Sequence, residues 1–204
     1  MGFYSRVVFP RLCEWTLSAP PIAEQRRTLL AAAEGSVLEI GFGTGLNLPH
    51  YPASIKKLTT ADPSVGMQQL AQRRIAESGI EVDQRLLSGE ELPFADGTFD
   101  CVVSTFTLCS IERVEKAIAE ASRVLTSGGR FLFLEHGLSP DAAVRKWQRR
   151  LNWLQRRLAG GCHLDRDMPR LVEKQAFSSV ACEAFYLEHT PRTHGYLYRG
   201  CAFK

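Results

Sequence analysis

The sequence lacks the features that would indicate a membrane-spanning, secreted or repetitive protein. No apolar run approaches the roughly 18 residues that are needed to cross a bilayer. The N-terminal segment contains Arg6, Pro10, Arg11 and Glu14, and it therefore has no signal-peptide core. No repeat and no low-complexity segment interrupts the chain. We therefore expect a cytoplasmic protein.

The cysteines form no C-x-x-C pair and have no zinc-site spacing, so the sequence predicts no metal site. Their even number is compatible with disulfides, but a chain of 204 residues can build a stable core without them. We expect reduced thiols, as in cytosolic proteins. The cysteines are Cys13, Cys101, Cys109, Cys162, Cys182 and Cys201.

Net charge is also small, at a formal value of +3, and it gives no reason to expect a nucleic-acid partner. The length and the hydrophobic fraction of 45% are typical of one globular α/β domain. Basic residues gather in a single place, because positions 145–157 contain six of them and no acid. These basic residues are Arg145, Lys146, Arg149, Arg150, Arg156 and Arg157.

The chain is organised around a short apolar run that leads into alternating glycines. Val37–Ile40 contains two β-branched residues and is typical of a buried strand. Gly41, Gly43 and Gly45 follow at once, and glycine lets a ligand approach the backbone closely. The stretch predicts a strand that ends in a tight turn, which is where ligands bind in open α/β sheets.

The spacing of the glycines indicates which ligand binds there. The dinucleotide fingerprint G-x-G-x-x-G needs a glycine at the position of Leu46, which disfavours a nicotinamide oxidoreductase. Here the third glycine comes one residue earlier, and Glu39 lies two residues before the first. The form E-x-G-x-G-x-G resembles the first motif of class I S-adenosylmethionine-dependent methyltransferases. That resemblance implies S-adenosylmethionine as the cofactor.

The next segment fits the same interpretation. Leu58–Ala61 is expected to form the second strand and to end in Asp62, whose carboxylate can accept hydrogen bonds from ribose hydroxyls. Alternatively, Asp62 caps the following helix, although Ser64 can do so alone. Asn47 is expected near the methionine end of the cofactor, or it is a cap or loop residue.

By resemblance to these methyltransferases, the adenine-binding side is assigned to the loop after the predicted strand 81–87. Many relatives have an aspartate at the position of Ser88, but a hydroxyl and the backbone N–H groups of Gly89 or Glu90 can also reach the ring. The carboxylate of Glu90 is otherwise expected to be solvated or to stabilise its loop. Thr105 follows the predicted fourth strand, 101–104, at the end that faces the transferred methyl group.

The remaining patterns complete a Rossmann-like α/β fold. Seven strands are expected, and the resemblance to class I methyltransferases implies that they form a mostly parallel sheet with an antiparallel C-terminal hairpin. The expected helices cover residues 22–33, 112–125 and 141–158, and the expected later strands cover 130–134, 180–186 and 195–203.

Two segments are expected to lie outside this sheet. Residues 1–34, an apolar start that includes Phe3, form an N-terminal cap ahead of a methyltransferase domain at 35–204; the cap either closes over the substrate or packs on the sheet edge. Residues 141–176 form a predicted helical lid. Its basic helix, 144–158, has one apolar stripe, and it contacts an anionic membrane surface or leaves its charged face in solvent.

A second resemblance narrows the family. Leu108-Cys109-Ser110, Glu135-His136, Trp147-Gln148 and Gly161-Cys162-His163 occur in the order found in the methyltransferase-like protein 7 family, whose members methylate small alkyl thiols. The resemblance spans roughly residues 37–204, and its glycine region is also similar to that of bacterial phospholipid N-methyltransferases. It implies a small, apolar thiol as the methyl acceptor. The alternatives are N-methylation of a phospholipid headgroup amine or other small amine, and a non-catalytic S-adenosylmethionine-binding partner protein.

This resemblance also suggests a substrate pocket formed by Cys109, His136 and His163. A free thiol is only a few per cent thiolate at neutral pH, so a base would assist the reaction. His136, at the end of the fifth strand, is the candidate general base, and its alternative role is to bond the following loop. Cys109 is expected to line the pocket, because direct methyl transfer needs no nucleophile.

Overall fold

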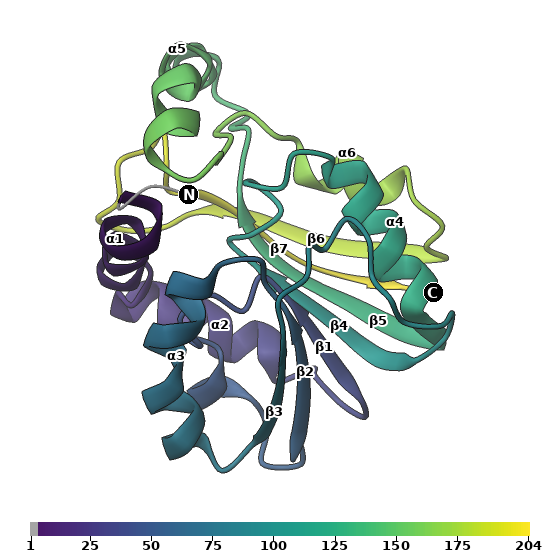
Figure 1. The fold of residues 1–204 in the computed structure, drawn as a ribbon. Helices are drawn as coiled ribbons and strands as arrows, with labels where there is room; N and C mark the ends of the chain where they lie inside the picture. Colours follow the sequence, from purple (N-terminus) through teal and green to yellow (C-terminus); the bar gives the residue numbers. More distant parts are fainter. Residues whose placement is uncertain (1–3) are drawn as a thin grey trace.

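The computed structural model describes residues 4–204 and centres on a seven-stranded sheet in the order β3-β2-β1-β4-β5-β7-β6 (Figure 1). Strands β1 to β5 run parallel, whereas β7 is antiparallel to both of its neighbours. The predicted Rossmann-like fold is therefore confirmed. The strands are β1 (Val37–Ile40), β2 (Lys57–Ala61), β3 (Glu81–Arg85), β4 (Phe99–Thr105), β5 (Leu125–His136), β6 (Ser179–Tyr186) and β7 (Tyr196–Phe203).

Helices cover both faces of this sheet and bury two apolar clusters against it (Figure 1). Helices α2 and α3 lie on one face, whereas α4 and α6 lie on the other (Figure 1). Both faces of β1 are covered, and all four of its residues are buried, as expected for a central parallel strand. The helices are α1 (Phe9–Leu17), α2 (Pro20–Leu30), α3 (Val65–Ser78), α4 (Val114–Val124), α5 (Ala142–Leu158) and α6 (Met168–Glu173), with a π-helical turn at Tyr4–Val8 and a 3-10 turn at Leu48–His50.

Several predicted boundaries differ from the structure by two residues or more, and two of these differences have identifiable reasons. Helix α2 begins at Pro20, two residues before the predicted start, because proline is well accommodated in the first helical turn, where its missing N–H is not needed. Strand β5 begins at Leu125, five residues before its predicted start, because the two glycines at 128–129 form a bulge inside the strand. Phe99 pairs with Leu125 while Cys101 pairs with Arg130, so the chain between them loops out of register.

Helix α5 lies beyond one end of the sheet, with α1 nearby (Figure 1). The hydroxyl of Tyr4 donates to the carbonyl of Leu158 at 2.5 Å, which ties the N-terminal segment to the end of α5. Within the predicted lid, α6 behaves differently, since Met168 and Val172 are fully buried in the core beside α4. Phe3, part of the predicted apolar start, lies outside the described residues. Within residues 4–204, no helix combines the length and the apolarity needed to cross a membrane.

Candidate functional site

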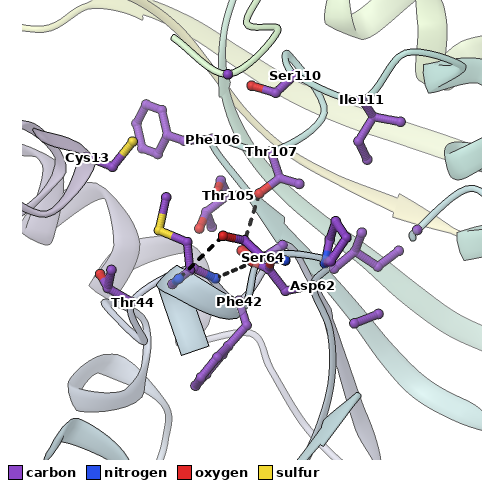
Figure 2. A pocket seen from close by; sticks show the side chains of 18 of the residues that line it. Cys13, Phe42, Thr44, Asp62, Ser64, Thr105, Phe106, Thr107, Ser110 and Ile111 are labelled. Atoms are coloured by element: carbon purple, nitrogen blue, oxygen red, sulfur yellow. Dashed lines mark hydrogen bonds between the residues drawn. The ribbon is translucent and has the colours of Figure 1, made fainter. Parts of the chain in front are cut away.

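A cavity of about 360 Å³ opens at the carboxyl ends of β1, β2 and β4 (Figure 2). Ligands of open α/β sheets bind at this end of the strands. Figure 2 shows Cys13 of α1 on one side and Ile111 on the other, with Thr107 between them. Of the predicted cofactor residues, the following line the cavity: Gly41, Gly43, Asp62, Ser88, Gly89, Glu90 and Thr105. Glu39, Gly45 and Asn47 are not part of its wall.

The glycine turn has a conformation that only glycine adopts readily. Gly41 has φ of +78°, and a Cβ at this position would lie 2.0 Å from the Thr107 hydroxyl oxygen. The Gly41 N–H donates to the carbonyl of Ala61 at 2.8 Å, so the turn is fastened to the end of β2. The Gly43 N–H donates to Asp62 at 2.7 Å. The backbone therefore passes closely along the cavity floor without a side chain filling it.

Asp62 holds the ends of β1 and β2 together and faces the cavity. One carboxylate oxygen accepts from Gly43 and the other accepts from the N–H of Ser64, each at 2.7 Å. The side chain of Ser64 caps α3 by accepting from the N–H of Met67 at 3.3 Å, so Asp62 is not needed as the cap. Burial raises the pKa of Asp62 despite these two hydrogen bonds. Each carboxylate oxygen has a further lone pair that can accept from a ligand hydroxyl.

Glu39 and Asn47 form a polar network beneath the cavity. Glu39 is 1% exposed, and its carboxylate accepts from the Tyr51 hydroxyl at 2.7 Å and from the Asn47 amide at 2.9 Å. Burial raises the pKa of Glu39 to about 7. The network fixes the segment after the glycine turn. Glu39 therefore influences the shape of the cavity indirectly, by holding Asn47 and Tyr51 in place.

Arg26 of α2 is a cavity residue that the sequence patterns did not identify. Its guanidinium donates to the side-chain amide oxygen (Oδ1) of Asn47 and to the Thr105 hydroxyl, both at 2.7 Å. Arg26 is 4% exposed, and its Nε has no hydrogen-bond partner among the residues that the structure describes. Burial lowers its pKa to about 10, so the group is still cationic at neutral pH. Arg26 falls in the apolar stripe between Ile22 and Leu29, a position that could have indicated a buried charge.

The predicted adenine side is formed by Ser88, Gly89 and Glu90. A Cβ on Gly89 would lie 2.5 Å from the Ile40 side chain, so the loop packs directly on the end of β1. The Ser88 hydroxyl accepts from the N–H of Glu90 at 3.2 Å. The carboxylate of Glu90 accepts from the backbone and side chain of Arg113, which lowers its pKa. The carboxylate of Glu90 thus stabilises its own loop, and Glu90 also borders the cavity.

None of the three residues predicted for the substrate pocket lines the cavity. Cys109 and His136 are near Cys162, and the His136 Nε2 atom is 2.9 Å from the Cys162 sulfur. The hydrogen bond from Cys109 and the imidazole of His136 lower the pKa of Cys162. Ser110, which does line the cavity, contacts the Cys109 sulfur at 3.6 Å. His163 lines a separate hollow beside α5, and its pKa is lowered by burial.

The loop after β4 is held in place by Glu135, the last buried residue before His136. Its carboxylate accepts from the N–H groups of Thr107 and Leu108, each at 2.8 Å. Burial raises the pKa of Glu135, while these backbone donors act in the opposite direction. The carboxylate of Glu135 therefore fixes the loop after β4, which forms one wall of the cavity.

Comparison with known proteins agrees with this geometry. Residues 38–133 match the family model described as a methyltransferase domain. The chain is 34% identical over 154 residues to the rat thiol S-methyltransferase TMT1B, which covers 74% of this chain and 63% of that protein. It is 36% identical over 129 residues to the phosphatidylethanolamine N-methyltransferase of Cereibacter sphaeroides, covering 60% and 63%.

A solved SAM-dependent methyltransferase from Thermotoga maritima superposes with a TM-score of 0.70 at 20% identity, covering 98% of both chains. This likeness concerns the fold alone. The chain spans between 61% and 65% of the length of the thiol S-methyltransferases that it matches. Residues 38–133 therefore match a methyltransferase domain, and the sheet order and the glycine turn with Asp62 agree with that match.

Proposed function

We propose that this protein transfers the methyl group of S-adenosylmethionine to a small, apolar thiol. The observation that carries this proposal is the apolar wall of the cavity opposite Asp62. Helix α1 contributes Phe9, Cys13 and Leu17 to this wall, and the loop after β4 contributes Phe106 and Ile111. An apolar surface of this kind favours a hydrocarbon chain over a charged acceptor. The relatives that are thiol S-methyltransferases support the same class of acceptor.

The cofactor lies across the cavity floor in this proposal. Asp62 accepts from the ribose hydroxyls, and the loop of Ser88 and Gly89 borders the adenine. Arg26 pairs with the carboxylate of the methionine moiety, because a buried guanidinium with an unused N–H favours an anionic partner. Asn47 and Thr105 orient that guanidinium. Phe106 and the apolar wall would border the sulfonium methyl group.

The reaction itself demands mainly positioning. The acceptor sulfur attacks the methyl carbon in line, the bond between that carbon and the sulfonium sulfur breaks, and S-adenosylhomocysteine leaves with a methyl thioether. The thiol proton leaves to solvent or to a base. Well-oriented placement of two reactants can lower the activation free energy by about 7–11 kcal/mol. Helix α1 and the loop after β4 provide that placement by enclosing the acceptor between Cys13 and Ile111.

A product assay separates this proposal from the amine alternative. The enzyme is incubated with S-adenosylmethionine and one of three acceptors, namely an alkyl thiol, hydrogen sulfide or phosphatidylethanolamine vesicles. We expect methylated alkyl thiol, with the alcohol of the same chain length as an unreactive control. Methylated lipid would favour headgroup N-methylation instead. No product from any acceptor, with calorimetry still detecting cofactor binding, would leave the thiol assignment without support.

We further propose that α5 contacts an anionic membrane surface. Its predicted apolar stripe is only partly covered, since Val144 is buried whereas Trp147 and Leu158 are more than half exposed. Trp153 adds a further exposed ring at 63%. The six basic residues of positions 145–157 surround these apolar groups. An amphipathic helix with exposed tryptophans and a basic face binds anionic lipid through both burial and charge.

Vesicle co-sedimentation tests this membrane contact. We expect the protein to sediment with vesicles that contain phosphatidylserine at low salt and to be released at high salt, because exposed charges are screened. Replacing Arg149 and Arg156 with glutamine should weaken sedimentation. Replacing Lys57 and Arg85, which are exposed on β2 and β3, should not. Equal sedimentation of both double variants, or equal binding to neutral vesicles, would contradict the contact.

A further inference from the structure

Cys109, His136 and Cys162 come from three separate parts of the chain and meet behind the acceptor side of the cavity. Cys109 is in the loop after β4, His136 ends β5, and Cys162 is in the turn after α5. Their ligand atoms all lie within 4.8 Å of one another. Both cysteines are nearly inaccessible, at 2% and 6% exposure. Two sulfurs and one imidazole nitrogen are therefore held together inside the protein.

The contacts within the protein do not fully satisfy this group. The His136 Nε2 atom contacts the Cys162 sulfur, but the Nδ1 atom is buried without a hydrogen-bond partner in residues 4–204. The Cys162 sulfur also accepts hydrogen bonds from Cys109 and, at 3.5 Å, from the Gln155 amide.

We propose that Cys109, His136 and Cys162 bind one Zn²⁺ ion. Thiolate and imidazole are the ligands that zinc prefers in proteins, with Zn–S near 2.3 Å and Zn–N near 2.0–2.1 Å. A tetrahedral ion with those bonds would hold its ligand atoms about 3.5–3.8 Å apart. All three separations are at most 4.8 Å, and the contact between His136 and Cys162 has to lengthen by less than about 1 Å to admit the ion.

The charges of this site balance. Two thiolates neutralise the dipositive ion, so the occupied site carries no net charge into the interior, where an unpaired charge is costly. Binding displaces two thiol protons to solvent and changes no oxidation state. The Gln155 amide then donates to a zinc-bound sulfur, as outer partners of zinc sites commonly do.

The position of the site relates it to the cavity. Three protein ligands leave a fourth position open, which is the arrangement of catalytic rather than purely structural zinc sites. The Ser110 hydroxyl contacts the Cys109 sulfur and Ser110 also lines the cavity, so the site lies one residue behind the acceptor wall. Occupation of the imidazole nitrogen by the ion would replace the predicted role of His136 as general base. The zinc site itself does not depend on which acceptor is methylated.

Cobalt titration tests the site directly. The full-length, reduced protein is stripped with a chelator and titrated with Co²⁺ without oxygen. We expect one ion per chain, with intense visible bands typical of tetrahedral Co²⁺ and a thiolate-to-cobalt charge-transfer band. Zn²⁺ should displace the cobalt. Cys109→Ser, Cys162→Ser and His136→Gln should each weaken binding by more than the roughly 10–100-fold typical of a lost outer partner. Cys182→Ser, which removes an exposed thiol elsewhere, should bind as the wild type does.

Alkylation of the wild type keeps the proposal testable if the ligand variants fail to fold. Zn²⁺ should protect Cys109 and Cys162 from a thiol-alkylating reagent, as read by peptide mass spectrometry. Cys182 should react equally with and without the metal, because it lies outside the group. Absence of tetrahedral cobalt bands in fully reduced protein, or equal alkylation of Cys109 and Cys162 with and without Zn²⁺, would overturn the site.

Discussion

Replacement of Asp62 with alanine is expected to weaken the binding of S-adenosylmethionine by roughly tenfold or more, because a hydrogen bond to a charged group contributes about 1.5–3 kcal/mol. The variant loses the acceptor for the ribose hydroxyls, and the N–H groups of Gly43 and Ser64 lose their partner. Isothermal titration calorimetry measures the effect. In the proposed arrangement Asp62 contacts the adenosine part of the ligand, so 5′-methylthioadenosine, which lacks the amino acid, should lose affinity by a similar factor.

Two further variants separate ribose binding from the structural role of this segment. Asp62→Asn keeps one acceptor oxygen but not the charge, and an intermediate loss is expected. Ser64→Ala removes the cap of α3 and should cost about 1 kcal/mol of stability while leaving cofactor affinity close to that of the wild type. Unchanged affinity of Asp62→Ala for both ligands, in a folded protein, would remove Asp62 from the ribose site.

Replacement of Arg26 with methionine should weaken S-adenosylmethionine binding by roughly thirtyfold or more, because truncating one member of a buried, hydrogen-bonded charge pair costs about 2–5 kcal/mol. The guanidinium is buried, charged at neutral pH and adjacent to the cavity. Its proposed partner is the carboxylate of the methionine moiety. The variant should therefore bind 5′-methylthioadenosine with nearly normal affinity, in contrast to the Asp62 variant.

Neighbouring positions supply the controls for Arg26. Arg27→Met changes an exposed residue of the same helix, one that pairs with Glu24, and affinity should not change. Arg26→Lys keeps the charge but cannot donate to Asn47 and Thr105 in the same geometry, so a partial loss is expected. Equal losses of affinity for S-adenosylmethionine and 5′-methylthioadenosine in Arg26→Met would contradict the contact with the carboxylate.

The part of the site that lies close together in the sequence could be predicted from it. The strand Val37–Ile40 and the glycines after it define a local turn whose geometry follows from short-range sterics, and Asp62 follows its own strand directly. Parallel pairing then brings the ends of β1 and β2 together, as the motif implies. Strand direction was expected from the resemblance to class I methyltransferases, and the pairing of β7 with β5 and β6 confirms the antiparallel end of the sheet.

Contacts between distant residues could not be predicted in this way. Arg26 meets Asn47 and Thr105 only after α2 packs on the sheet, and a single arginine in a helix gives no sign of its partner. Cys109, His136 and Cys162 are separated by about 26 residues each, so no short spacing reveals them as a group. The part of α1 in the cavity wall depends on how the N-terminal segment folds back over the sheet.

The thiol preference is tested most directly with a single acceptor that offers both a thiol and an amine, such as an alkyl chain with one group at each end. The protein is supplied with S-adenosylmethionine that carries a trideuterated methyl group, and mass spectrometry locates the label on sulfur or nitrogen. Because both groups enter the same cavity on the same chain, differences in uptake cannot decide the outcome. The S-methyl product is predicted, whereas label on nitrogen alone would contradict thiol methylation.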